Sequence, residues 1–215
     1  GSDVRDVPPR TPDPPDPATP RFALDVAAIG GMYAGHIHLI GTEAGLGVNH
    51  GGTIDASGAL TLDVNGWLST HSGARTVGHT VSINAHGLRN TEGAVIAARQ
   101  HLAISAGRDI SAIASQIEAK RTIAMDAVGD MTLASAADEQ HSYSKTKKVT
   151  RQEDHERQVG TSLTAGADVV LSAGKDLSLI SSRISAGNEA YLVAGDDLEL
   201  LAAQDSDYSL YDKKK

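Results

Sequence analysis

A seven-residue motif occurs four times in this chain, in two pairs whose members are 21 residues apart. ISAGRDI at 104–110 is followed by MDAVGDM at 125–131, and LSAGKDL at 171–177 is followed by LVAGDDL at 192–198. A period between about 20 and 50 residues is typical of repeat architectures, in which each unit packs on its neighbours. The chain should therefore fold as a stack of similar units.

Apolar residues alternate with polar or small ones within each unit. This alternation recurs at the 21-residue step in four ranges, 60–64, 81–85, 102–106 and 123–127. Strict alternation over five residues predicts a half-buried β-strand. The same step taken from Leu39 leads to Leu60, so we expect the pattern to begin there, although weakly.

A second series of short alternating segments follows the same step. It contains Ile54, Ile96 and Ile117, each followed two residues later by alanine. Arg75 interrupts this series, which predicts an irregular coil near residues 73–78. The two series together give each unit two or three short strands.

These features predict an all-β fold, a right-handed parallel β-helix of about eight coils of about 21 residues. A single coil cannot bury its apolar side, but coils stacked about 4.8 Å apart close a continuous core. The low aromatic content, 3%, suits a narrow interior filled by aliphatic residues. A leucine-rich-repeat horseshoe has a similar period, but its Leu-x-x-Leu-x-Leu-x-x-Asn pattern is absent.

The regular pattern is interrupted by a polar excursion at 138–160. It resumes with a larger offset of 67 residues, which relates Asp109 to Asp176 and Asp130 to Asp197. A second excursion, 204–215, matches the first at the same offset. We predict a hairpin extruded from the solenoid wall at each excursion. A short helix in the first one is the alternative, because its Gln, Glu and Arg residues tolerate helix well.

Residues 1–21 differ from the rest and contain all seven prolines. Such a segment favours an extended, disordered arm, which leaves 22–215 for the β-helix. Gly1 and Ser2 are typical of a cloning scar, so a native signal peptide would lie outside this sequence.

Composition argues against several classes of function. The formal net charge of -8 disfavours nucleic acid as a partner. No apolar run is long enough for membrane insertion, and the absence of cysteine excludes disulfides and thiolate chemistry.

Three segments resemble the filamentous haemagglutinin family. They are ALDVAAIGGMYAGHIHLIGTEAGLGV at 23–48, the AGRDI, AGKDL and AGDDL coils, and LLAAQDSDYSLYDKKK at 200–215. The family consists of large two-partner-secretion exoproteins of Gram-negative bacteria, including contact-dependent growth-inhibition proteins. The resemblance implies a β-helical shaft exported through an outer-membrane transporter, which parts outside this sequence would engage, and displayed at the cell surface. Members act in adhesion, in biofilm formation or in carrying a C-terminal toxin to other bacteria.

Two sets of side chains suggest metal or catalytic chemistry. The repeated aspartates could hold calcium or act as acid and base, as in β-helix enzymes that cleave polysaccharides. We prefer a structural role in which each Asp binds nearby backbone N–H groups, because the aspartates recur once per coil. His36 and His38 have the i, i+2 spacing of two metal ligands but lack a third. No catalytic motif occurs, so we expect neither an enzyme nor a cofactor.

The first excursion is the better candidate for binding. It carries a basic and aromatic cluster that could contact an anionic glycan or a receptor on a host or bacterial cell, formed by Tyr143, Lys145, Lys147, Lys148 and Arg151. Acidic residues at 153–156 follow at once, so an internally paired, solvated hairpin is the alternative. Three functions stay open: a structural shaft, which we favour, a receptor-binding or glycan-binding segment, and a polysaccharide-cleaving enzyme.

Overall fold

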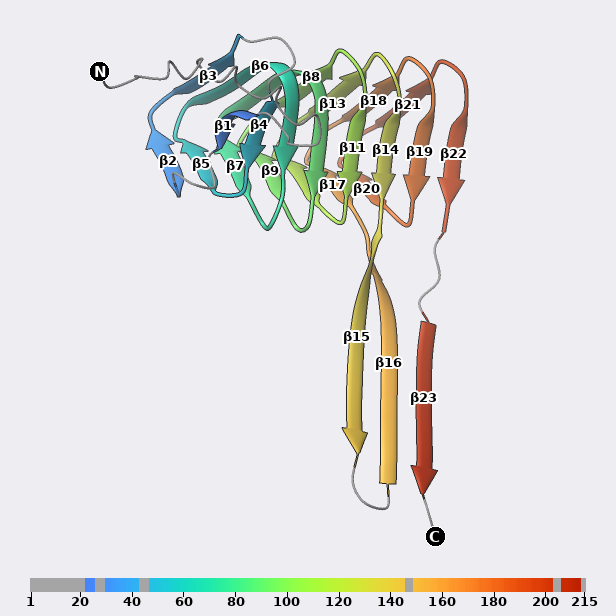
Figure 1. Cartoon of the computed structure of the whole chain (residues 1–215). Coiled ribbons are helices and arrows are strands. Elements are labelled where there is room, and N and C mark those ends of the chain that lie inside the picture. The colour runs from blue at the N-terminus through green and yellow to red at the C-terminus, as the bar shows by residue number, and fades with distance from the viewer. Residues whose placement is uncertain (1–21, 26–29, 43–46, 146–148, 203–205, 214–215) are drawn as a thin grey trace, which may run out of the picture.

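The computed structural model describes residues 22–25, 30–42, 47–145, 149–202 and 206–213, and it is a parallel β-solenoid of about seven turns (Figure 1). The predicted all-β solenoid is confirmed, with about one turn fewer than expected. The proposed arm at 1–21 lies outside the described residues. Within the described residues, no helix is long and apolar enough to cross a membrane.

The largest sheet has thirteen strands and forms two adjoining flanks of the solenoid. Its strands are β1 (Phe22–Asp25), β3 (Ile37–Gly41), β4 (Gly47–His50), β6 (Ala59–Thr70), β8 (Thr80–Thr91), β10 (Leu102–Ala106), β11 (Ile110–Ile113), β13 (Ile123–Ala127), β14 (Met131–Ala134), β18 (Val169–Ala173), β19 (Leu177–Ile180), β21 (Ala190–Ala194) and β22 (Leu198–Leu201). The long strands β6 and β8 continue around the corner between the two flanks and so join them into one sheet.

A seven-stranded sheet forms the third flank. Its strands are β2 (Gly31–Ala34), β5 (Thr53–Ala56), β7 (Arg75–Gly78), β9 (Val95–Ala98), β12 (Gln116–Ala119), β17 (Ser162–Ala165) and β20 (Arg183–Ala186). Every strand pair in these two sheets is parallel, and each coil hydrogen-bonds to the coils before and after it.

The core is built by the predicted alternation. Ile104, Met125 and Leu171 lie in one column across β10, β13 and β18, and each is at most 2% exposed. Because strand residues alternate between faces, their neighbours Ser105, Asp126 and Ser172 point outward. Aliphatic columns of this kind fill the interior along the solenoid.

Two expectations about register were wrong. Leu39 pairs with Leu62 rather than Leu60, so the first step is 23 residues. The segment near Arg75 is also regular: it forms β7, and Thr76 takes the inward position between Ile54 and Ile96. Extra residues in the corners shift the register without breaking the hydrogen-bonded ladder, which a fixed period cannot detect.

The first polar excursion is an antiparallel hairpin, as predicted, and the helical alternative is wrong. Strands β15 (Ala136–Lys145) and β16 (Val149–Val159) pair along their length and project from the solenoid (Figure 1). The second excursion differs from the prediction. It contributes one strand, β23 (Ser206–Lys213), which pairs with β16 in a three-stranded sheet.

Candidate functional site

The repeated aspartates form a ladder along one corner of the solenoid. The backbone N–H of Asp130 donates to Asp109 Oδ1 at 2.9 Å, that of Asp176 to Asp130 Oδ1 at 3.3 Å, and that of Asp197 to Asp176 Oδ1 at 3.1 Å. Each carboxylate thus satisfies a backbone donor of the next coil, which is the structural role preferred from the sequence.

The two candidate metal ligands have separate partners. His36 Nδ1 accepts the backbone N–H of Ala59 at 3.1 Å, and His38 Nε2 donates to Asp63 Oδ2 at 2.7 Å. Among the described residues, no group of three or more His, Asp or Glu side chains is placed to hold a metal ion.

The basic cluster is only partly covered by the structure. Tyr143 and Lys145 lie on β15 and Arg151 on β16, where the backbones of Tyr143 and Gln152 are paired. Lys147 and Lys148 lie outside the described residues. A role of this cluster in binding therefore stays a prediction.

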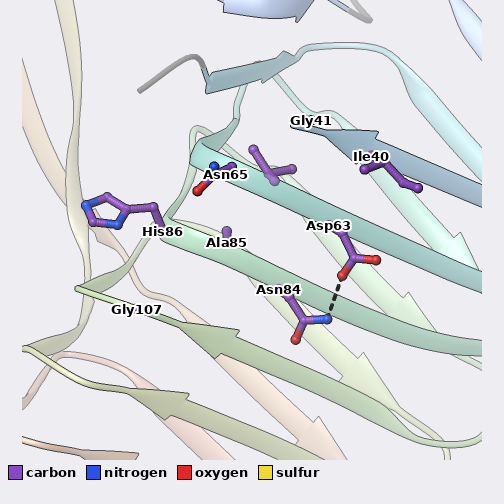
Figure 2. Close-up of a pocket in the computed structure, with 9 residues that line it drawn as sticks. Ile40, Gly41, Asp63, Asn65, Asn84, Ala85, His86 and Gly107 are labelled. Atoms are coloured by element: carbon purple, nitrogen blue, oxygen red, sulfur yellow. Dashed lines mark hydrogen bonds between the residues drawn. The ribbon is translucent and has the colours of Figure 1, made fainter. Parts of the chain in front are cut away.

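A recess of about 410 Å³ opens at the corner after β3, β6, β8 and β10 (Figure 2). We call it the corner recess. It combines an exposed apolar side chain, polar groups and glycine, and its lining includes Ile40, Asp63, Asn65, Asn84, His86 and Gly107.

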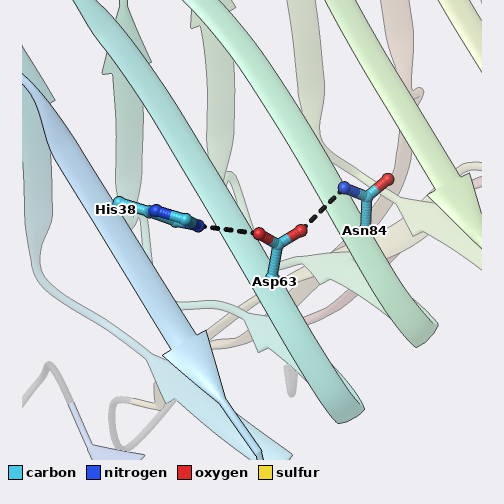
Figure 3. Close-up of polar contacts among 3 residues, drawn as sticks. All are labelled: His38, Asp63 and Asn84. Carbon is cyan, nitrogen blue, oxygen red and sulfur yellow. Dashed lines mark hydrogen bonds and ion pairs between the residues drawn. The ribbon is translucent and has the colours of Figure 1, made fainter.

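Asp63 is the centre of the polar contacts at this recess. Its Oδ2 accepts from His38 Nε2, and its Oδ1 accepts from Asn84 Nδ2 at 2.7 Å (Figure 3). These two hydrogen bonds, that from Asn84 first, hold the pKa of the Asp63 carboxyl below its usual range. The group is therefore ionised at neutral pH and fixed in orientation by two neighbouring coils.

A difference in corner length explains the irregular surface here. Val64 pairs with Ala85 and Leu68 with Leu88, while Ala85 and Leu88 pair with Ala106 and Ile110 in the next coil. The β8 corner is thus one residue shorter than the corners on both sides of it. A short corner between two longer ones recedes from the surface.

The indole of Trp67 covers the short corner on its other side. A Cβ atom at Gly87 would lie 2.6 Å from Trp67 Cζ3, so only glycine allows this approach. The guanidinium carbon of Arg89 lies 4.6 Å from the centre of the indole ring, a cation–π contact. Trp67 and Arg89 therefore brace the corner that carries His86.

The sequence analysis missed this recess because it followed the inward positions alone. The signal was present in the corner segments, where three residues separate Val64 from Leu68 and Ala106 from Ile110, but two separate Ala85 from Leu88.

A second polar feature lies inside the solenoid. His50, Thr70 and Asn90 occupy one inward column, each at most 1% exposed, and we call them the polar column. The Thr70 hydroxyl donates to Asn90 Oδ1 at 2.5 Å, and His50 Nε2 donates to the carbonyl oxygen of Arg75 at 3.2 Å. No described group lies within hydrogen-bonding distance of His50 Nδ1.

The polar column was also missed, although His50 and His71 are 21 residues apart. The backbone N–H of His71 donates to the carbonyl oxygen of His50 at 3.1 Å, so they are neighbours in the stack. Burial, and then the charge of His71, lower the pKa of His50.

Comparison with known proteins identifies the repeat. The Hemagglutinin repeat family matches residues 40–150 and 142–215, most of the chain. The chain belongs to the filamentous haemagglutinin family. The resemblance found in the sequence is therefore confirmed, and the stacked coils are those of a haemagglutinin repeat region.

Relatives in this family are much longer proteins. The chain is 36% identical over 183 residues to the tRNA nuclease CdiA of Yersinia mollaretii, an alignment that covers 77% of this chain and 6% of that relative. It is 54% identical over 50 residues to the Toxin CdiA of Yersinia pestis, covering 23% of this chain and 2% of the relative. It is 47% identical over 58 residues to the tRNA nuclease CdiA-2 of Burkholderia pseudomallei, covering 26% and 2%. No solved structure matches the chain.

Proposed function

We propose that this haemagglutinin repeat region is a stiff shaft segment of a secreted, cell-surface exoprotein. Its function is to hold a binding or toxic module away from the producing cell, and it performs no chemistry itself. The observation that carries the proposal is the continuous backbone ladder, which links every coil to the next on each flank.

Stacking gives the segment its stiffness. Each coil contacts mainly its two neighbours, so bending the axis would stretch the hydrogen bonds on one flank. The Asp109 to Asp197 ladder adds side-chain links along one corner. The spacing of coils, about 4.8 Å, then sets the reach of the shaft.

The family suggests the cellular setting. An outer-membrane two-partner-secretion transporter is the proposed export partner, and the outer cell surface is the proposed location. The printed names of the relatives suggest the delivery of a toxin as well as adhesion. The chain spans about 6% of the first relative, so any toxic activity would lie elsewhere in such a protein.

A second candidate function is direct binding through the hairpin. The hairpin β15–β16 projects from the solenoid (Figure 1), so a basic cluster on it would be accessible to another cell. Lys and Arg near one another attract sulfated glycans or other anionic surfaces, and such binding weakens with salt.

One experiment separates the two functions. Labelled chain is added to mammalian epithelial cells and to Gram-negative bacteria, beside a variant that lacks residues 136–160. The hairpin coil advances 46 residues from Ile123 to Val169, against 21 from Leu102 to Ile123, so removing these 25 residues restores the ordinary spacing. The solenoid of the variant should therefore stay folded, which circular dichroism checks.

A shaft predicts no saturable binding by either protein to either cell type. Binding that is lost on deletion, and also in a variant with Lys147→Glu and Lys148→Glu, would instead assign the receptor contact to the hairpin. Binding that the deletion does not change would place a receptor site on the solenoid and contradict both candidates.

A further inference from the structure

We propose that the corner recess is a binding site for an uncharged, polyhydroxylated ligand, a neutral sugar. The inference goes beyond the shaft function, because a spacer requires no such site. It rests on the shape of the recess, on the polar groups that converge in it and on their charge.

The recess has the size of a ligand site. Its volume of about 410 Å³ lies within the range of about 300–1,000 Å³ that is usual for small-molecule sites. It is built by four successive coils, and the short corner at Ala85–Leu88 makes it concave. Gly41 and Gly107 line it without side chains that would fill the space.

The polar groups fit the hydroxyl groups of a sugar. A carboxylate has about four acceptor positions, and Asp63 uses one of each oxygen for His38 and Asn84. The remaining positions can accept from two neighbouring hydroxyls. The amide of Asn84 keeps its oxygen and a second N–H, and His86 adds an imidazole (Figure 2). A sugar hydroxyl both donates and accepts, so it can pair with each of these groups.

The positions of these groups are fixed before a ligand arrives. His38 and Asn84 hold the Asp63 carboxylate from the coils on either side (Figure 3). Groups that are already oriented lose little conformational entropy on binding. Ile40, whose side chain is 62% exposed, provides an apolar wall for the C–H groups of a sugar ring.

Charge favours a neutral ligand over an anionic one. Asp63 is the only formally charged residue in the lining of the recess, so sulfated or carboxylated glycans would be repelled. This separates the corner recess from the basic cluster of the hairpin, whose expected ligands are anionic. The two sites can therefore be tested independently.

The test is a binding screen followed by calorimetry. The chain is applied to immobilised neutral sugars (glucose, galactose, mannose, N-acetylglucosamine and their disaccharides), with heparin as the anionic comparison. We expect saturable binding of at least one neutral sugar, with a Kd on the order of 1 mM for a monosaccharide. Asp63→Ala should weaken it at least about tenfold, because it removes charged hydrogen-bond acceptors.

Asp126→Ala is the matched control. Asp126 occupies the same outward column as Asp63 and Asn84, across Ser105, but lies outside the recess. It should bind as the unmodified chain does. Fluorescence of Trp67, the one tryptophan of the chain, checks that the adjoining corner is intact in every variant.

Three results would overturn the proposal. They are no binding of any neutral sugar by the unmodified chain, equal losses in Asp63→Ala and Asp126→Ala, and no loss in Asp63→Ala. Binding to heparin alone, abolished by Lys147→Glu and Lys148→Glu but not by Asp63→Ala, would reject the recess in favour of the hairpin cluster. Failure of the shaft function is judged separately, from the cell-binding experiment.

Discussion

At the scale of single residues, the polar column makes the first coils sensitive to acid. His50 is fully buried, and its Nε2 already donates to Arg75 O. A second proton on Nδ1 would be a buried donor for which the described residues offer no acceptor, and the nearby His71 opposes the charge. Burial therefore holds the pKa of His50 below 6.5.

This predicts a loss of stability as the pH falls. The unfolded chain takes up a proton at His50 near pH 6.5 while the folded chain does not, so the contribution is full above that pH. It then declines by at most about 1.4 kcal/mol per pH unit until the folded pKa is reached. Urea unfolding followed by Trp67 fluorescence, between about pH 7.5 and pH 5.5, measures the slope.

Two variants make this prediction specific to His50. His50→Gln keeps a donor for Arg75 O but cannot titrate, so its stability should depend less on pH. His79→Gln removes an exposed histidine and should behave as the unmodified chain. Equal pH dependence in all three proteins would exclude His50 as the acid-sensitive group.

At the scale of strands and coils, the inward columns could be predicted, while the corners could not. A column such as Ile104, Met125 and Leu171 must be apolar, so its period is visible in the sequence. Corners face solvent and accept different lengths. The missing or extra residues at Leu39, Arg75 and Ala85 therefore left no hydrophobic signal. The corner recess is a consequence of one such difference.

The same register argument predicts that coils can be removed singly. Deleting residues 107–127 joins Ala106 to Val128, which preserves every inward column because Ala106 and Ala127 are paired. We expect this variant to keep its β-sheet circular dichroism and a cooperative thermal transition.

Deleting residues 108–127, one residue fewer, is the matched control. It shifts later strands by one position relative to the preceding coils, and a shift of one residue turns the apolar side chains outward. This variant should lose the transition or melt far lower. Equal melting of the two variants would show that the coils do not depend on register, and would weaken the shaft proposal.

At the scale of the whole molecule, the last described coil exposes positions that are buried elsewhere in the stack. Leu198 and Leu200 are 47% and 66% exposed, whereas their partners Leu177 and Leu179 in the preceding coil are 0% and 8% exposed. Covering one leucine side chain is worth about 1.5–3 kcal/mol. An open parallel edge with apolar side chains also tends to pair with another chain.

We therefore predict that the chain associates in solution through this end, with an apparent mass that rises with concentration in sedimentation velocity. Leu198→Lys with Leu200→Lys places two charges on the inward face and should shift the chain toward the monomer. Glu199→Lys is the control, because Glu199 lies between the two leucines on the opposite face of β22 and its replacement leaves the apolar positions intact. If Glu199→Lys abolishes association equally, charge rather than the open apolar edge controls it. A chain that stays monomeric at every concentration would show that the exposed end is not adhesive, and a stack of coils would then need other contacts to assemble further.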